Sequence, residues 1–155
     1  MIQHIIRSIA LGLECMHVNF NFIHRDIKPE NVLINFSGAP SGTKKEDVWN
    51  HPDFCNFVDI KLCDLGLSKP LEIEGTATQV GTKNFICPEN HLGKGYDFKA
   101  DVWALGSVAF ELFTGRPIMD FFDPNKKDLD EKFIDGILYH PKVECITLEY
   151  IDFLS

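Results

Sequence analysis

The first seventeen residues carry apolar side chains at helical spacing. Their apolar positions recur every three or four residues, the pattern of a helix with one buried face: Ile2, Ile5, Ile6, Ile9, Leu13 and Met16. We therefore predict a core-packing helix over residues 2–17. A second stretch, Asp101–Gly115, is apolar nearly all round, which is typical of a buried central helix. We expect Asp101 to be its N-cap and Gly115 to end it, because Pro117 follows where a helix could not continue.

Shorter apolar runs between these two helices predict strands. Phe20, Phe22 and Ile23 alternate with polar asparagines, which indicates a short extended segment. Two brief strands are predicted at residues 31–35 and 58–63, because both runs are apolar and bounded by polar or turn-forming residues. We expect these two strands to pair.

Residues 36–57, which separate the two predicted strands, differ in character from their surroundings. Residues 37–42 contain two serines, two glycines and a proline, charged residues follow, and then come the aromatic residues Trp49, Phe54 and Phe57. We therefore predict a loop or insertion here. Its aromatic residues could dock it on the body of the protein or contact a partner, and we favour docking.

Composition and charge narrow the class of protein. With 155 residues, 45% of them apolar and 25% charged, the chain fits one globular domain. Its 15 basic and 23 acidic residues give a net charge of −8, which argues against nucleic acid or an anionic membrane as partner and favours a basic peptide. Five scattered cysteines without a C-x-x-C pair, no secretory signal and no membrane-length apolar run predict an intracellular protein, cytoplasmic or nuclear.

Residues 24–31 read His-Arg-Asp-Ile-Lys-Pro-Glu-Asn, and further short motifs follow in a fixed order. These are Asp64-Leu-Gly, Gly81-Thr82, Cys87-Pro-Glu, and Asp-Val-Trp-Ala-Leu-Gly from residue 101. Their joint order resembles the eukaryotic-type serine/threonine protein kinase family over about residues 5–117. The resemblance implies a mainly α fold with small β-hairpins, the C-terminal lobe of a protein kinase.

The same resemblance implies the catalytic roles and the cofactors, ATP and Mg²⁺. Asp26 matches the catalytic base that accepts the proton of the substrate hydroxyl. Asn31 and Asp64 match the residues whose oxygen atoms hold Mg²⁺ and, with it, the nucleotide. Lys28 matches a lysine that contacts the γ-phosphate in serine/threonine kinases, so protein serine and threonine hydroxyls are the expected acceptors.

Other residues match regulatory and structural positions of the family. Arg25 matches an arginine that pairs with a phosphate on the activation loop, here residues 67–86, where Thr76 and Thr78 are the candidate acceptors. Thr82 matches a threonine near the substrate and the catalytic aspartate. Four residues match structural positions, the last bracing the catalytic loop through its backbone: His24, Gly66, Glu89 and Asp101.

The sequence also departs from the family pattern. Leu65 stands where the family usually has phenylalanine, and Cys87 replaces an alanine. The spacing from His17 to His24 is about one residue longer than usual. No G-x-G-x-x-G loop precedes the catalytic loop. We therefore expect residues 1–155 to be a partial kinase domain that lacks the N-terminal lobe.

Two functions remain open on this evidence. The first is an ATP-dependent protein serine/threonine kinase, present as a truncated catalytic domain to which a partner supplies the missing lobe. Its intact set of Asp26, Asn31 and Asp64 favours this function. The second is a catalytically inactive kinase-like binding or regulatory module, which the missing phosphate-covering loop favours.

Overall fold

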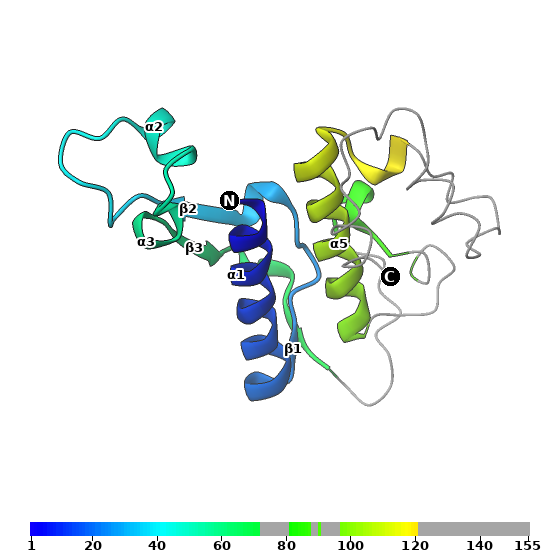
Figure 1. Cartoon of the computed structure of the whole chain (residues 1–155). Helices are drawn as coiled ribbons and strands as arrows, with labels where there is room; N and C mark the ends of the chain where they lie inside the picture. The colour runs from blue at the N-terminus through cyan, green and yellow to red at the C-terminus, as the bar shows by residue number, and fades with distance from the viewer. Residues whose placement is uncertain (72–80, 88–89, 91–96, 121–155) are drawn as a thin grey trace.

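The computed structural model describes residues 1–71, 81–87, 90 and 97–120. In this part of the chain the protein is helical, with two small two-stranded sheets. Two long helices, α1 (Ile2–Glu14) and α5 (Phe98–Thr114), lie side by side (Figure 1). Both helices were predicted from the sequence. The sequence also predicts a short helix near residues 129–138, in a stretch rich in aspartate, and this segment lies outside the described residues.

The main core lies between these two helices. The buried face of α1 consists of Ile5, Ile6, Ile9 and Leu13, none more than 5% exposed. This face meets Ala104, Val108 and Ala109 on α5, and the two alanines allow the helices to approach closely. Burying one such aliphatic side chain contributes about 1.5–3 kcal/mol. The apolar stripe of the sequence therefore fixes how α1 packs.

The end of α1 contains an unusual turn. Residues Cys15–Asn19 form a π-helix, η1, which continues directly from α1. A π-helical turn holds one more residue than an α-helical turn does. This turn contains His17 and leaves its ring within hydrogen-bonding distance of Asp101 on α5.

Helix α5 begins earlier than the sequence predicted. Its N-cap is Asp97, whose carboxylate accepts a hydrogen bond from the backbone N–H of Lys99 at 2.7 Å. Asp101 is in the first turn and only 1% exposed, so the N-cap prediction for Asp101 is wrong. The predicted end is confirmed, since Gly115 has the left-handed conformation (φ 69°) of a helix C-cap.

The four strands form two nested antiparallel pairs. In the inner pair β2 (Val32–Asn35) lies against β3 (Asp59–Leu62), as predicted. In the outer pair β1 (Phe22–Ile23) lies against β4 (Lys69–Pro70). Two single 3-10 turns, η2 (Pro29–Asn31) and η3 (Leu65–Leu67), stand between the inner and outer pairs. Because the pairs are nested, residues 24–31 and 63–68 lie close together.

Residues 36–57 connect β2 to β3 and contain two short helices, α2 (Lys45–Trp49) and α3 (Phe54–Phe57). The backbone N–H of Gly38 donates to the carbonyl of Phe57 at 3.2 Å and closes the segment at its base. Val48, Phe54 and Val58 form a small core of its own. Trp49 also packs on the main core, so the aromatic residues of the segment are docked on the body of the protein. In Figure 1 α2 and α3 project on the side of α1 away from α5.

Within the described residues, no helix is both long enough and apolar enough to cross a membrane. Of the activation-loop-like segment 67–86, only residues 67–71 and 81–86 are described. Thr76, Thr78 and Glu89 lie outside the described residues. Two further 3-10 turns, η4 (Lys83–Phe85) and η5 (Ile118–Asp120), flank the ends of α5 in the sequence.

Candidate active site

The loop after β1 is held by one buried carboxylate. The side chain of Asp101 accepts hydrogen bonds from the backbone N–H groups of His24 at 2.8 Å and Arg25 at 2.9 Å. Nε2 of His17 donates to the same carboxylate at 2.8 Å. Arg25 has a positive φ of 68°, a conformation that costs about 1–3 kcal/mol in a residue other than glycine. Asp101 therefore stabilises a strained backbone at the start of the loop.

The fully buried ring of His24 connects the two halves of the site. Its Nδ1 accepts a long hydrogen bond (3.4 Å) from the backbone N–H of Asp26. Its Nε2 therefore carries the proton and donates to the carbonyl of Cys63 at 3.2 Å. The ring links the backbone of Asp26 to the residue immediately before Asp64.

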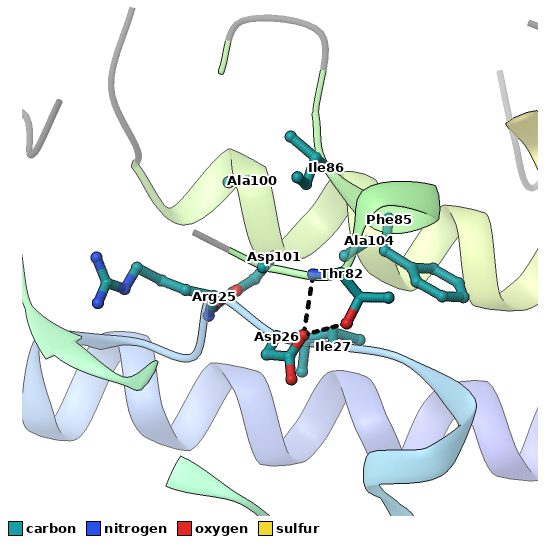
Figure 2. A pocket seen from close by; sticks show the side chains of 10 residues that line it. Arg25, Asp26, Ile27, Thr82, Phe85, Ile86, Ala100, Asp101 and Ala104 are labelled. Carbon is teal, nitrogen blue, oxygen red and sulfur yellow. Dashed lines mark hydrogen bonds between the residues drawn. The ribbon is translucent and has the colours of Figure 1, made fainter. Parts of the chain in front are cut away.

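Four donors surround the carboxylate of Asp26. Thr82 donates to Oδ1 through both its hydroxyl (2.7 Å) and its backbone N–H (3.1 Å) (Figure 2). Lys28 Nζ donates to Oδ2 at 2.6 Å and Asn31 Nδ2 donates to the same oxygen at 3.1 Å. Lys28 Nζ also donates to the hydroxyl oxygen of Thr82 at 2.9 Å. These four residues thus form one hydrogen-bonded cluster.

The charges of this cluster reinforce each other. Burial would raise the pKa of Asp26, but the hydrogen bonds from Lys28 and Thr82, the charge of Lys28 and the hydrogen bond from Asn31 together lower it below its ordinary value. The hydrogen bond to Asp26 raises the pKa of Lys28, and the nearby charges of Asp26, Glu30 and Asp64 add to that effect. Asp26 and Lys28 are therefore both ionised near neutral pH.

Asp64 is exposed and lies beside Asn31. The backbone N–H of Cys63 donates to the carbonyl of Asn31 at 2.9 Å, which brings the next residue, Asp64, to the same edge. Asp64 has a left-handed backbone (φ 62°), and its Oδ1 accepts from the N–H of Gly66 at 3.2 Å. A Cβ at Gly66 would lie 3.1 Å from that oxygen, so the glycine leaves room for the carboxylate.

These side chains fit a magnesium ion. The amide nitrogen of Asn31 donates to Asp26, which leaves the amide oxygen of Asn31, like the exposed carboxylate of Asp64, as an oxygen ligand that a metal ion could use. Mg²⁺ is typically held by one or two protein oxygens, with water and substrate phosphates completing the shell. Among the described residues there is no cluster of three or more metal-binding side chains, so a closed all-protein metal cage is not present in this part of the chain.

The family described as protein kinase domain matches residues 1–154. The chain belongs to the protein kinase domain family. It is similar to serine/threonine-protein kinase gad8 of Schizosaccharomyces pombe, with 35% identity over 136 residues (88% of this chain, 20% of the relative). It is similar to serine/threonine protein kinase ypkA of Aspergillus fumigatus, with 33% identity over 150 residues (96% and 20%). It is also similar to the human putative serine/threonine-protein kinase PRKY, with 33% identity over 135 residues (87% and 40%). The chain thus spans a fifth to two fifths of the length of these relatives.

The Arg25 side chain turns away from the cluster around Asp26. The Arg25 side chain is largely buried, and its Nε donates to the carbonyl of Leu67 at 2.6 Å. Figure 2 shows the side chain pointing away from Asp26. Arg25 therefore contacts the start of the segment that carries Thr76 and Thr78.

A small pocket lies behind Asp26. It is lined on one side by the catalytic loop, with Asp26 and Ile27, and on the other by Thr82, Phe85 and Ala104 (Figure 2). Phe85 and Ile27 belong to the main core together with residues of α1 and α5. The position of Thr82 against Asp26 is therefore tied to the packing of the two long helices.

Sequence reasoning missed one residue that shapes the site. His17 donates to Asp101, and its ring lies against that of Phe98 with the centroids 4.6 Å apart. The only signal in the sequence was the spacing between His17 and His24. That spacing could not indicate which residue on α5 the ring would contact.

Proposed function

We propose that this chain is the C-terminal lobe of a protein serine/threonine kinase, which transfers the γ-phosphate of ATP to serine or threonine hydroxyls of proteins. The cluster of Asp26, Lys28, Asn31 and Thr82 carries this proposal, because it gathers an ionised carboxylate, a cation and an amide at one point. Phosphoryl transfer requires mainly such positioning and charge stabilisation.

In this proposal each side chain of the cluster has a separate task. Asp26 accepts the hydrogen bond of the acceptor hydroxyl, orients its oxygen and takes up its proton. Lys28 Nζ, which already bridges Asp26 and Thr82, neutralises charge on the transferring phosphate. Asn31 and Asp64 hold Mg²⁺, which supplies positive charge at the phosphate oxygens.

The remaining residues of the site support this arrangement. His24 and Asp101 fix the backbone on both sides of the catalytic loop, and Gly66 leaves space for the Asp64 carboxylate. We propose that Arg25 responds to phosphorylation of Thr76 or Thr78, because its side chain already holds Leu67 at the start of their segment. We assign Glu89 a structural role through its place in the Cys-Pro-Glu motif.

Acidic side chains near the catalytic loop suit a basic protein substrate. Burial raises the pKa of Glu111 on α5, and the negative charges of Glu30 and Asp120 raise it further. Asp120 is already paired with Arg116 at 2.7 Å, so a cationic side chain of a substrate would chiefly relieve the repulsion between Glu30 and Glu111. We propose intracellular proteins with basic residues as substrates. We also propose that a kinase N-terminal lobe, supplied by a partner or by a longer form of this chain, binds over the nucleotide.

The direct test is transfer of labelled γ-phosphate from Mg-ATP to a basic serine/threonine peptide. Asp26→Asn should abolish transfer, whereas the matched control Asp53→Asn, an exposed carboxylate in residues 36–57, should not change it. Circular dichroism of both variants checks the fold. Equal transfer by the protein and Asp26→Asn would overturn the role of Asp26. No transfer by the folded protein would favour the inactive binding module.

The metal role has its own test. Asp64→Ala removes one of the two proposed protein ligands and should weaken binding of Mg-nucleotide in titration calorimetry. The control is Asp59→Ala, on β3, whose carboxylate accepts a hydrogen bond from Ser37. Unchanged Mg-nucleotide affinity in Asp64→Ala would contradict the assignment.

A further inference from the structure

Residues 36–57 present an exposed serine at the apex of a tight turn. The backbone N–H of Thr43 donates to the carbonyl of Pro40 at 3.1 Å and closes this turn. Gly42 is the third residue of the turn and has a φ of 86°, the conformation that a type II turn requires at that position. Ser41 is the second residue of the turn, and it is exposed to solvent. Its hydroxyl is therefore accessible to another molecule.

The hydroxyl groups of this turn differ from the others in the described part of the chain. The side chains of Ser41 and Thr43 make no hydrogen bond within the described residues. The other six serine and threonine hydroxyls described there are all hydrogen-bonded: Ser8, Ser37, Ser68, Thr82, Ser107 and Thr114. A hydroxyl that enters a catalytic site must first give up such bonds, so Ser41 and Thr43 have the least to lose. Ser41 is the more exposed of the two.

The charge of the segment around Ser41 suits the substrate class of the proposed function. Residues 36–45 contain Lys44 and Lys45 and no acidic residue, in a chain whose net charge is −8. Both lysines are exposed, and the backbone of Lys44 is extended (φ −74°, ψ 145°). In the catalytic loop Glu30 is exposed, two residues after Lys28. Opposite charges therefore favour the approach of this segment to a catalytic loop.

The segment is held away from the catalytic loop of its own molecule. The hydrogen bond between Gly38 and Phe57 closes its base, and Trp49 packs it on the main core. Figure 1 shows α2 and α3 on the side of α1 away from α5, whereas the pocket behind Asp26 is lined by residues of α5. The catalytic loop that Ser41 can reach is therefore that of a second copy of the chain.

We propose that Ser41 is a phosphorylation site of this kinase, modified by the active site of a second copy; the inference rests on the proposed function. The Oγ of Ser41 attacks the γ-phosphorus of ATP bound to the second copy, and a new O–P bond forms. The bond between that phosphorus and the β–γ bridging oxygen breaks, and ADP leaves with the electron pair. The hydroxyl proton passes to Asp26 of the second copy.

Phosphorylation removes the charge that attracts the segment. A phosphoserine carries a charge of about −1.5 to −2 at neutral pH, which offsets most or all of the positive charge of Lys44 and Lys45. The modified segment is then no longer a basic substrate, and the second copy releases it. The reaction is thus self-limiting: we expect one phosphate on the segment, at Ser41, and none at Thr43.

Mass-spectrometric mapping after incubation with Mg-ATP tests the site directly. Asp26→Asn supplies an acceptor that cannot catalyse, and Ser41→Ala supplies a catalyst without the acceptor hydroxyl. Neither variant alone should gain phosphate at position 41, but a mixture should gain it at Ser41 of the Asp26→Asn chain. In the unaltered chain, the rate per molecule should rise with protein concentration. Ser37, whose hydroxyl donates to Asp59, is the internal control and should stay unmodified.

A matched pair of lysine variants tests the charge argument. Lys44→Gln should lower the rate of phosphorylation at Ser41 about two- to fivefold, the effect of losing one exposed ion pair. Lys99→Gln, which removes an exposed lysine on α5, should leave that rate unchanged. Both variants should transfer phosphate to an external peptide as the unaltered chain does. Equal rates at Ser41 in the two variants would overturn the role of Lys44.

Each other outcome of the mapping overturns a defined part. Peptide transfer without phosphate at position 41 overturns this inference and leaves the proposed function standing. Absence of both overturns the proposed function and the inference with it. A rate per molecule that does not depend on protein concentration overturns the reaction between two copies. Phosphate on Thr43 in place of Ser41 overturns the choice of acceptor, and phosphate on both residues overturns the self-limiting step.

Discussion

The Asp101→Ala substitution is expected to destabilise the protein far more than the loss of a surface carboxylate. Asp101 is 1% exposed and accepts hydrogen bonds from the backbone N–H groups of His24 and Arg25. Alanine would leave both N–H groups buried without an acceptor. Each such loss costs about 1–3 kcal/mol, so the free energy of unfolding should fall by about 2–6 kcal/mol. A whole domain has only about 5–15 kcal/mol.

Two further variants calibrate this magnitude. Asp101→Asn keeps one oxygen acceptor, so it should lose about half as much, about 1–3 kcal/mol. Asp97→Ala removes the N-cap of α5, which is exposed, and should cost about 1 kcal/mol. If Asp101 were only the N-cap, as the sequence alone suggested, Asp101→Ala would cost no more than about 1 kcal/mol.

The assay is urea unfolding followed by tryptophan fluorescence, with Trp49 and Trp103 as the reporters. The three variants should rank Asp101→Ala, Asp101→Asn, Asp97→Ala from most to least destabilised. If Asp101→Ala proves no more costly than Asp97→Ala, the carboxylate does not brace the catalytic loop as described, and the reasoning from buried hydrogen bonds fails.

Three other predictions follow from the same structure. Gly66→Ala places a Cβ 3.1 Å from Oδ1 of Asp64 and should weaken Mg-nucleotide binding in calorimetry while changing stability by less than about 1 kcal/mol. Because the pKa of Asp26 is lower in the folded protein than its ordinary value of 3.8, the ionised carboxylate stabilises the fold at pH values above 3.8. This stabilisation is lost as the pH falls toward the pKa of the folded state, so Asp26→Asn should lose less stability between pH 5 and pH 3 than the unaltered chain does. Because the pKa of Glu111 is raised in the folded protein, its ionisation lowers the stability as the pH rises through 4.5. Glu111→Gln should therefore stabilise the protein at pH 7 but not at pH 4, as measured by urea unfolding. Equal effects at both pH values would contradict this direction.

The sequence predicted the elements whose signal is long or repeated. The stripe from Ile2 to Leu13 is periodic over three turns, so α1 could be placed correctly. The end of α5 could be predicted from Gly115 alone, because a helix C-cap of this kind requires only a residue that tolerates a positive φ. The pairing of β2 with β3 followed from two apolar runs on either side of residues 36–57.

The features that were missed depend on contacts between distant residues. Asp97 and Asp101 both precede an apolar run, and only the positions of His24 and Arg25 decide which of them faces the catalytic loop. The helices α2 and α3 have five and four residues, too few to show a period, and short helices are stabilised mainly by packing. The order of the motifs predicted that Asp26, Asn31 and Asp64 share one site. It could not predict the three hydrogen bonds that Thr82 makes with Asp26 and Lys28, because these depend on how distant segments fold together.

Because the two strand pairs are nested, residues 36–57 form a loop that can accept an insertion. The inner pair and the Gly38–Phe57 hydrogen bond close residues 36–57 at their base, so the proposed catalytic residues lie outside the loop that an insertion would lengthen. Gly42, in the turn before α2, has φ 86° and open space where a side chain would lie. Doubling the length of a loop costs only about 0.6 kcal/mol in closure entropy. A reporter peptide or a sensor module inserted at Gly42 should therefore be carried without moving Asp26 or Asp64.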